Sequence, residues 1–249
     1  MTFAFERLRF HLRAQDALHF PAGTSANILR GGFGIVLPRI DPEAYARIFA
    51  PSHAGPSGLA DPPRPFVFRA AHLDGRHIAP GETFHFDVHL FDQRQPAAPH
   101  FARAFEQLAR EGFGPGRGRA ELLTVEPLAA PELRLDQPGT AAAVRVRFVT
   151  PTELKTADGL ADRPEFTVLF ARLRDRISTL RALYGPGPLA IDFRAMARRA
   201  ALIELTGCRI RHVALGRRST RTGQAHPLGG FTGEARYEGP LGEFLPYLY

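Results

Sequence analysis

The order of the predicted strands and helices constrains the fold of this 249-residue chain more than any single motif. In residues 7–14, Leu8, Phe10 and Leu12 alternate with charged or polar side chains, which predicts a strand with one apolar face. Helical spacing of apolar residues and flanking stop signals predict the helices. The first half then reads as strand 7–14, helix 25–37 closed by Pro38, strands 66–70 and 83–91, helix 99–111 and strand 120–125.

The second half repeats this order without its last strand. Its elements are strand 144–149, helices 164–184 and 192–205, strands 208–215 and 233–238, and a helix that begins at 241. The order β-α-β-β-α-β is that of the ferredoxin-like unit. The expected fold class is therefore α+β, with two tandem ferredoxin-like (RRM-like) domains over residues 1–128 and 140–249. The second domain is expected to be incomplete at its C-terminus, through truncation or completion by another chain.

Composition excludes several classes of protein. The one cysteine, Cys208, cannot form an internal disulfide and cannot build a cysteine-ligated zinc or iron–sulfur site. The longest apolar runs are about five residues, whereas a membrane helix needs about 20. Charges follow the first residue too soon for a secretory signal. We therefore expect a cytoplasmic protein with no membrane contact and no metal or other cofactor.

The positive charge is uneven along the chain. Residues 170–221 carry twelve Arg and three acidic residues, a net charge of +9, which leaves −2 for the rest of the chain. Lys155 is the single lysine, and GC-rich codon usage is the simplest explanation of that bias. A basic half beside a nearly neutral half favours a polyanionic partner, nucleic acid above all, over a merely solvated surface.

Three predicted strands place arginine on the face opposite their apolar residues. Arg145 and Arg147 lie on one of them, and Arg209 and Arg211 on another. A cationic open sheet face is how RRM-type domains meet RNA, although the aromatic residues that usually stack bases are absent here. His85, Asp87 and His89 also share a strand face, but residues four apart on a strand lie roughly 13 Å apart, too far for one metal ion. We interpret them as an ordinary polar face.

Two loops combine flexible backbone with cations. The glycine-rich segment Gly112–Arg119 lets backbone N–H groups approach a phosphate beside Arg117 and Arg119, or is a plain turn. The segment Gly216–His226 offers arginines, hydroxyls and a histidine for gripping a phosphodiester, or is a solvated hairpin tip. Three glycines in Leu29–Gly34 weaken a helix, so we expect close packing or a bound ligand there.

Several segments together resemble the CRISPR-associated RAMP endoribonucleases that process CRISPR RNA precursors. They are Arg64–Val67, Gly112–Arg119, Thr150–Lys155, Pro227–Glu234 and, in the same pattern, Leu29–Gly34. Each is weak alone, and their order and spacing from about residue 19 onward carry the similarity. The resemblance implies two ferredoxin-like domains, RNA in a basic cleft, and metal-independent cleavage by the 2′-hydroxyl to a 2′,3′-cyclic phosphate. Relatives usually continue into a further glycine-rich loop and closing strand.

The resemblance also directs the search for site residues. The active histidine of such enzymes tends to lie near the first helix, which His19 and His53 flank here with Tyr45 between them; His226 is the other contender. Histidine suits the role of base because its pKa lies near 6.5. The residues expected to bind RNA are Arg30, Arg117, Arg119, Lys155, Arg209, Arg211, Arg217, Arg218, Ser219 and Arg221.

Two other interpretations stay open. One is a non-catalytic RAMP subunit that holds CRISPR RNA among the other subunits of an effector complex. The other is an unrelated double-ferredoxin protein that binds a small molecule or a protein. In the RNA-processing interpretation the partner is CRISPR repeat RNA, and the open sheet edge would allow a homodimer.

Overall fold

The computed structural model describes residues 1–51, 62–156, 159–218 and 225–248. It contains two compact units. The N-terminal unit comprises Ala4–Glu132 and Ala182–Gly187, and the C-terminal unit comprises Met1–Phe3, Leu133–Arg181 and Pro188–Tyr249. None of the helices in the described ranges is both long and apolar enough to cross a membrane.

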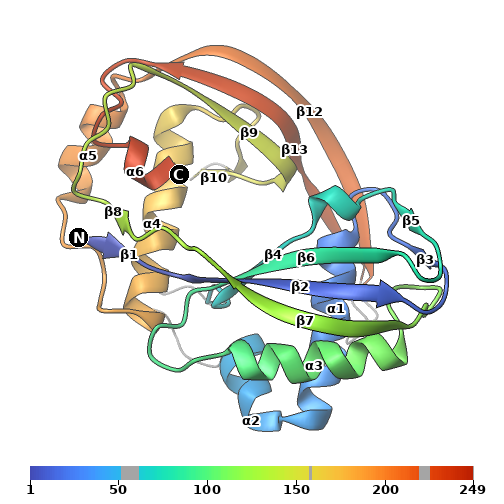
Figure 1. The fold of residues 1–249 in the computed structure, drawn as a ribbon. Helices are drawn as coiled ribbons and strands as arrows, with labels where there is room; N and C mark the ends of the chain where they lie inside the picture. Colours follow the sequence, from blue (N-terminus) through green and yellow to red (C-terminus); the bar gives the residue numbers. More distant parts are fainter. Residues whose placement is uncertain (52–61, 157–158, 219–224, 249) are drawn as a thin grey trace. The chain divides into compact units, whose positions relative to one another are not determined.

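The N-terminal unit is built on a four-stranded antiparallel sheet (Figure 1). Its strands run in the spatial order β4-β6-β2-β7, and β2 occupies a central position. Two helices, α1 and α3, connect the strands in the chain order of a ferredoxin-like unit, so this fold prediction is confirmed. The bounds are β2 Glu6–Ala14, α1 Ser25–Ile40, β4 Phe66–Arg69, β6 Thr83–Leu90, α3 Ala98–Glu111 and β7 Ala120–Leu128.

One face of this sheet packs against α1 and α3. Leu8, Phe10 and Leu12 of β2 are buried, as the alternation predicts. Phe10 stacks on Phe86 of the next strand with 5.0 Å between ring centroids, and on the helices Phe33 stacks on Phe101 at 4.2 Å. Burial of these rings stabilises the sheet–helix pairing. The opposite face carries the polar residues that alternate with the buried ones along β2 and β6.

The prediction that Pro38 ends the first helix was wrong, because α1 continues to Ile40 with the proline inside it. The chain then turns at Asp41, whose side chain accepts from the backbone N–H of Ala44 and starts α2 (Pro42–Ala44). The π-helical turn η1 (Tyr45–Phe49) follows. A Cβ at Gly34 would lie only 2.5 Å from the ring of Phe49, so close packing explains why a glycine stands at this position.

The C-terminal unit has a three-stranded antiparallel sheet in the order β12-β13-β9. Its core gathers aromatic rings from the sheet, α4 and the C-terminal segment, among them Phe166, Phe170, Tyr237 and Phe244. Within the described ranges, the outer edge of β9 pairs with no strand. The bounds are β9 Ala143–Thr152, α4 Phe166–Tyr184, α5 Phe193–Ala200, β12 Glu204–Arg218, β13 Ala225–Glu238 and α6 Leu245–Leu248.

The helix predicted over 192–205 is shorter, because α5 ends at Ala200. Asp192 caps its start by accepting from the backbone N–H of Ala195 at 2.9 Å. Glu204 already pairs with Glu238 in the sheet, so the last residues of the predicted helix belong to strand β12 instead. Strands β12 and β13 also extend well beyond 208–215 and 233–238, since glycines in both strands hide the strand periodicity.

Short strand pairs complete the fold. They place residues that are distant in sequence next to each other, and one of them builds the candidate site below. The pairs are β1 (Thr2–Phe3) with β8 (Leu133–Arg134), β3 (Leu18–His19) with β5 (His77–Ile78), and β10 (Lys155–Thr156) with β11 (Gly159–Leu160). The 3-10 turn η2 (Ala71–Leu73) precedes β5.

Candidate functional site

Two histidines meet where β3 pairs with β5. The backbone register sets Leu18 opposite Ile78 and His19 opposite His77. Leu18 and Ile78 are buried and anchor the pair in the core, while both histidines are exposed. The two imidazole rings are stacked, with 4.0 Å between centroids and 6° between planes. Sequence reasoning found His19 but missed His77, whose place depends on a contact across more than fifty residues.

The glycine-rich loop closes around this pair. It begins at Gly112, where α3 ends, and folds back so that the Phe113 N–H donates to the carbonyl of Gly118 at 2.9 Å. A Cβ at Gly118 would lie 2.6 Å from the carbonyl oxygen of Ala17, so only glycine lets the loop rest on β3. The result is a hollow of about 240 Å³ lined by Ala17, Leu18, His19, Pro21, His77, Phe113, Pro115, Gly116 and Gly118.

The two arginines of this loop hold its ends. Arg117 has φ of 46° and donates to the carbonyl of Glu111 at 3.2 Å, at the end of α3. Arg119 binds the carboxylate of Asp16 through Nε and Nη2 at 2.8 and 3.2 Å. This contact lowers the pKa of Asp16 below its usual value, with hydrogen bonds from the Arg119 side chain and backbone as the main causes. Arg119 therefore orders the loop in this structure.

The other predicted catalytic residues lie elsewhere. Tyr45 stacks on Phe49 at 5.4 Å, packs against the core of the N-terminal unit and does not line the hollow. His53 is outside the described residues. His226 belongs to β13, where the backbone register sets it opposite Arg217 of β12.

The residues predicted to bind RNA are scattered over both units. The guanidinium of Arg30 lies over the rings of Phe49 and Phe66, at 5.0 and 5.5 Å from their centroids. Lys155 is exposed on β10. Arg218 ends β12, and Ser219 and Arg221 are outside the described residues.

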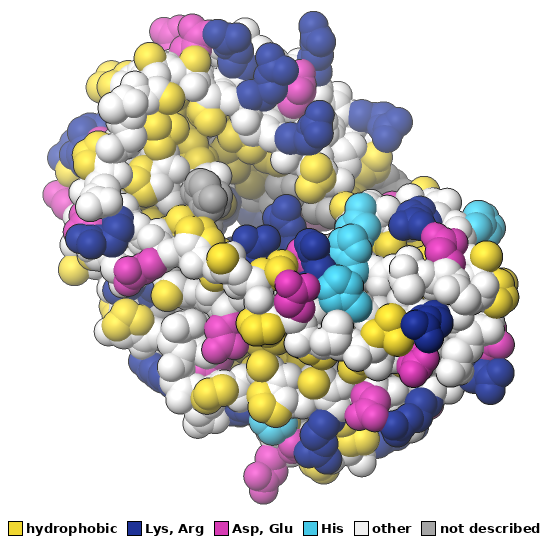
Figure 2. All heavy atoms as spheres, in the orientation of Figure 1, with side chains coloured by type: hydrophobic (Ala, Val, Ile, Leu, Met, Phe, Trp, Pro, Cys, Tyr) yellow, Lys and Arg dark blue, Asp and Glu magenta, His cyan; other side chains and the backbone are white. Residues whose placement is uncertain are grey.

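Arg209 and Arg211 belong to a group on the open face of the C-terminal sheet. The register aligns Arg209 with Glu234 and Arg147, and the neighbouring rung aligns Gly207 with Arg236 and Arg145. Because residues two apart on a strand share a face, all of these point the same way. We call this group the arginine face: Arg145, Arg147, Arg209, Arg211 and Arg236. A shallow hollow of about 200 Å³ lies among Arg145, Arg209 and Arg236, and Figure 2 shows basic side chains gathered over this sheet.

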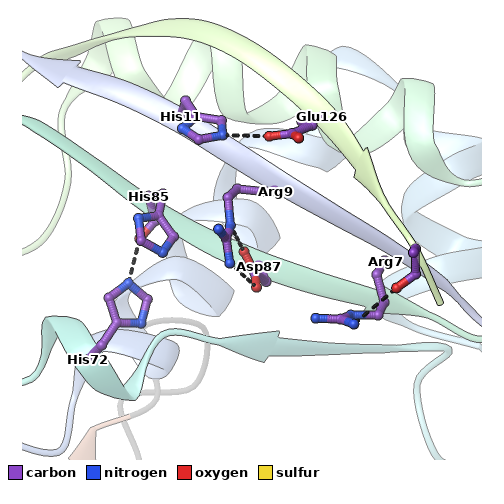
Figure 3. Close-up of polar contacts among 8 residues, drawn as sticks. Arg7, Arg9, His11, His72, His85, Asp87 and Glu126 are labelled. Atoms are coloured by element: carbon purple, nitrogen blue, oxygen red, sulfur yellow. Dashed lines mark hydrogen bonds and ion pairs between the residues drawn. The ribbon is translucent and has the colours of Figure 1, made fainter. Parts of the chain in front are cut away.

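The open face of the N-terminal sheet is different and was only partly predicted. Asp87 forms a two-pronged pair with Arg9, with N–O distances of 2.7 and 3.0 Å (Figure 3). His11 binds Glu126 at 3.0 Å, and His72 Nε2 lies 2.8 Å from the carbonyl oxygen of His85. We call the row His11, His85 and His72 the imidazole face. The space-filling view shows histidine side chains in a column beside basic and acidic ones (Figure 2).

Burial and nearby arginines keep two histidines of this sheet uncharged. Burial, then Arg9 and His72, lowers the pKa of His85. Burial, followed by Arg69 and Arg7, lowers the pKa of His89 to about 4. Both rings are therefore neutral at pH 7. Among the described residues, no group of three or more His, Cys, Asp or Glu side chains could hold a metal ion.

Two family models match this chain. Residues 3–142 match the family model AF_1859_N, described as an N-terminal domain, and residues 146–249 match the model of the CRISPR-associated endoribonuclease Cas6. No curated protein matches the chain. The chain therefore belongs to the family defined by the AF_1859_N N-terminal domain, and its residues 146–249 are similar to the CRISPR-associated endoribonuclease Cas6.

Solved structures share this fold at low sequence identity. A Cas6 product complex has a TM-score of 0.59 and 20% identity, with 98% of this chain and 94% of that chain covered. Thermus thermophilus Cas6 has a TM-score of 0.56 and 19% sequence identity, with 100% of this chain and 90% of that chain covered. The product of a Cas6-related gene from Pyrococcus furiosus has a TM-score of 0.52 and 14% sequence identity, with 98% of this chain and 90% of that chain covered. These likenesses support the tandem ferredoxin-like fold.

Proposed function

We propose that this chain cleaves CRISPR repeat RNA without a metal ion, and that His19 and His77 form its acid–base pair. The match of residues 146–249 to the Cas6 endoribonuclease model supports the reaction class. The observation that carries the proposed site is the stacked, exposed imidazole pair at the mouth of the hollow beside the glycine-rich loop. Histidine is the side chain best suited to exchange protons near neutral pH.

The chemistry needs two proton transfers at one phosphodiester. One imidazole removes the proton of the 2′-hydroxyl, whose oxygen attacks the adjacent phosphorus. The bond from phosphorus to the 5′-oxygen breaks, and the second imidazole donates the proton that this oxygen requires. The products are a 2′,3′-cyclic phosphate and a 5′-hydroxyl. Two rings 4.0 Å apart can reach one phosphate group together, which a single histidine cannot do in both roles at once.

The loop supplies the surroundings that this reaction requires. Gly116 lines the hollow with open space around its Cα, so a phosphate can approach the backbone there. Oriented backbone N–H groups and nearby cations stabilise the charge that develops on the phosphorane. Arg117 follows Gly116 directly in the sequence and is proposed to supply this positive charge.

The test is cleavage of repeat RNA by the purified chain in EDTA, with separate measurement of affinity. The His19→Ala and His77→Ala variants should each cut about 100-fold or more slowly while binding RNA as tightly as wild type. His100→Ala is the matched control, because His100 lies on α3 and bonds to Asp41. It should cut at the wild-type rate.

Two results would overturn the proposal. Unchanged cleavage in both variants would move the site to another histidine, so His53→Ala and His226→Ala belong in the same series. Tight, salt-sensitive binding with no cleavage in any sample would favour the non-catalytic RAMP subunit that holds CRISPR RNA in an effector complex.

A further inference from the structure

We infer that the imidazole face of the N-terminal sheet binds unpaired RNA bases by stacking, apart from the hollow that holds His19 and His77. The inference rests on the proposed function for the identity of the ligand as RNA. The face itself is defined by side chains on β2, β6 and η2 (Figure 3).

Three imidazole rings form a row across these elements. His72 and His85 are stacked, with 4.6 Å between centroids and 24° between planes. His11 follows at 6.1 Å from His85 with a tilt of 38°. One side of the His72 ring rests on His85, and because the residue is exposed, a planar ligand can reach the ring. Histidine is among the side chains on which single-stranded RNA bases stack.

The hydrogen bonds of the row also fix which ring nitrogens carry protons. The carbonyl oxygen of His85 can only accept, so Nε2 of His72 donates to it. The carboxylate of Glu126 likewise accepts from Nε2 of His11. The rings are therefore oriented before any ligand arrives. Both Nε2 atoms are also engaged, which argues against a metal ion as the ligand of this face.

The charges on this face favour a base over a phosphate. Arg9 is held by both carboxylate oxygens of Asp87, and 32% of its side-chain surface is exposed. His85 is neutral at pH 7 because burial and the charge of Arg9 lower its pKa. Arg7 and Arg69 share this face, but the register sets them opposite His89 and Asp87 and not opposite His85, so the rings of His72, His85 and His11 remain to stack on a base.

The experiment compares two RNA oligonucleotides of equal length, one with bases and one abasic, by fluorescence anisotropy in EDTA. Both carry the same phosphates, so the ratio of their affinities isolates the contribution of the bases. Wild type should bind the base-bearing strand about tenfold more tightly, the scale of one stacked base. His72→Ala should lose most of this ratio, and His72→Phe, which keeps a ring, should retain it.

His100→Ala, far along the chain on α3, should keep the wild-type ratio. The inference is overturned if His72→Ala discriminates between the two strands as wild type does, or if wild type binds both equally. Thermal melting of the variants separates loss of binding from loss of fold, since His72 is exposed and its replacement should not unfold the protein. Failure of RNA cleavage would reject the proposed function without deciding this test, because binding is measured independently of cutting.

Discussion

The open faces of the two sheets share strand geometry and differ in chemistry. On the N-terminal sheet, Arg9 is paired with Asp87 and His11 with Glu126. On the C-terminal sheet, the arginine face has five cations. Within the described part of the chain only Arg145 and Arg236 of these five form ion pairs, with Glu234 at 3.8 Å and Glu238 at 2.7 Å.

This difference indicates two ways of meeting a nucleic acid. Unpaired arginines attract phosphates irrespective of sequence, and their contribution falls with salt. Paired charges beside imidazole rings contribute less long-range attraction but offer surfaces on which bases stack. We therefore expect the C-terminal sheet to supply affinity and the N-terminal sheet to supply base contacts. Substitutions on each sheet can separate these two roles.

The largest effect should come from Gly233 of β13, which pairs with Ile210 of β12 between two arginines of the arginine face. Gly233 has φ of 131°, and a Cβ there would lie 2.1 Å from the carbonyl oxygen of Arg209. Gly233→Ala should lower the free energy of unfolding by about 2 to 4 kcal/mol, because the backbone must shift and the conformation is strained. Urea denaturation measures this change.

Gly207 provides the matched control on β12. A Cβ there meets only Cβ of Arg236, at 3.4 Å, which is ordinary contact. Gly207→Ala should change the free energy of unfolding by about 0.5 kcal/mol or less. Equal losses in the two variants would show that the backbone conformation and close contact at Gly233 carry no special strain.

The second effect concerns the neutral histidines of the other sheet. Burial lowers the pKa of His89 to about 4 in the folded protein, against 6.5 in the unfolded chain. The unfolded chain therefore binds more protons between these values, and stability falls as the pH drops through this window. Because of His89, the free energy of unfolding should fall by about 2 kcal/mol when the pH is lowered from about 7.5 to about 4.5, after allowance for solvent screening.

His89→Phe isolates this contribution, since a phenyl ring can keep the stacking on Phe5, now at 5.1 Å between centroids. The free energy of unfolding of this variant should fall less than that of wild type between the two pH values. If both proteins lose the same free energy on acidification, His89 is not a buried neutral histidine.

The smallest effect concerns the salt dependence of RNA binding. Arg209→Gln with Arg211→Gln should weaken binding of single-stranded RNA and reduce the log–log salt slope by about 0.7 for each phosphate that the protein no longer neutralises. His72→Ala should weaken binding with an unchanged slope, because it removes a ring and not a cation that pairs with phosphate. Equal slopes in the two proteins would remove the distinction between the faces.

Much of the fold could be predicted from the sequence because alternation and helical spacing are local signals. The strand with Leu8, Phe10 and Leu12 and the helix with Phe101 and Phe105 are clear cases. The predicted helix over 192–205 was too long because Glu204 gains strand partners that no local pattern indicates. The polar face of His85, Asp87 and His89 was predicted, but its pairing with Arg9 depends on the register of β2 against β6.

The candidate site was less predictable. His19 was named from a family resemblance, whereas His77 meets it only through a two-residue strand pair. His72 lies in a single 3-10 turn and gains its role from the carbonyl of His85. Such contacts between short elements follow from tertiary packing, which the sequence alone does not display.

Cleavage by His19 and His77 is tested most simply by incubating the purified chain with CRISPR repeat RNA in EDTA and analysing the product ends. We predict one cut that leaves a 2′,3′-cyclic phosphate and a 5′-hydroxyl, lost in His19→Ala and His77→Ala and kept in His100→Ala. Cleavage that requires a divalent metal, or that leaves a 3′-hydroxyl, would contradict this mechanism.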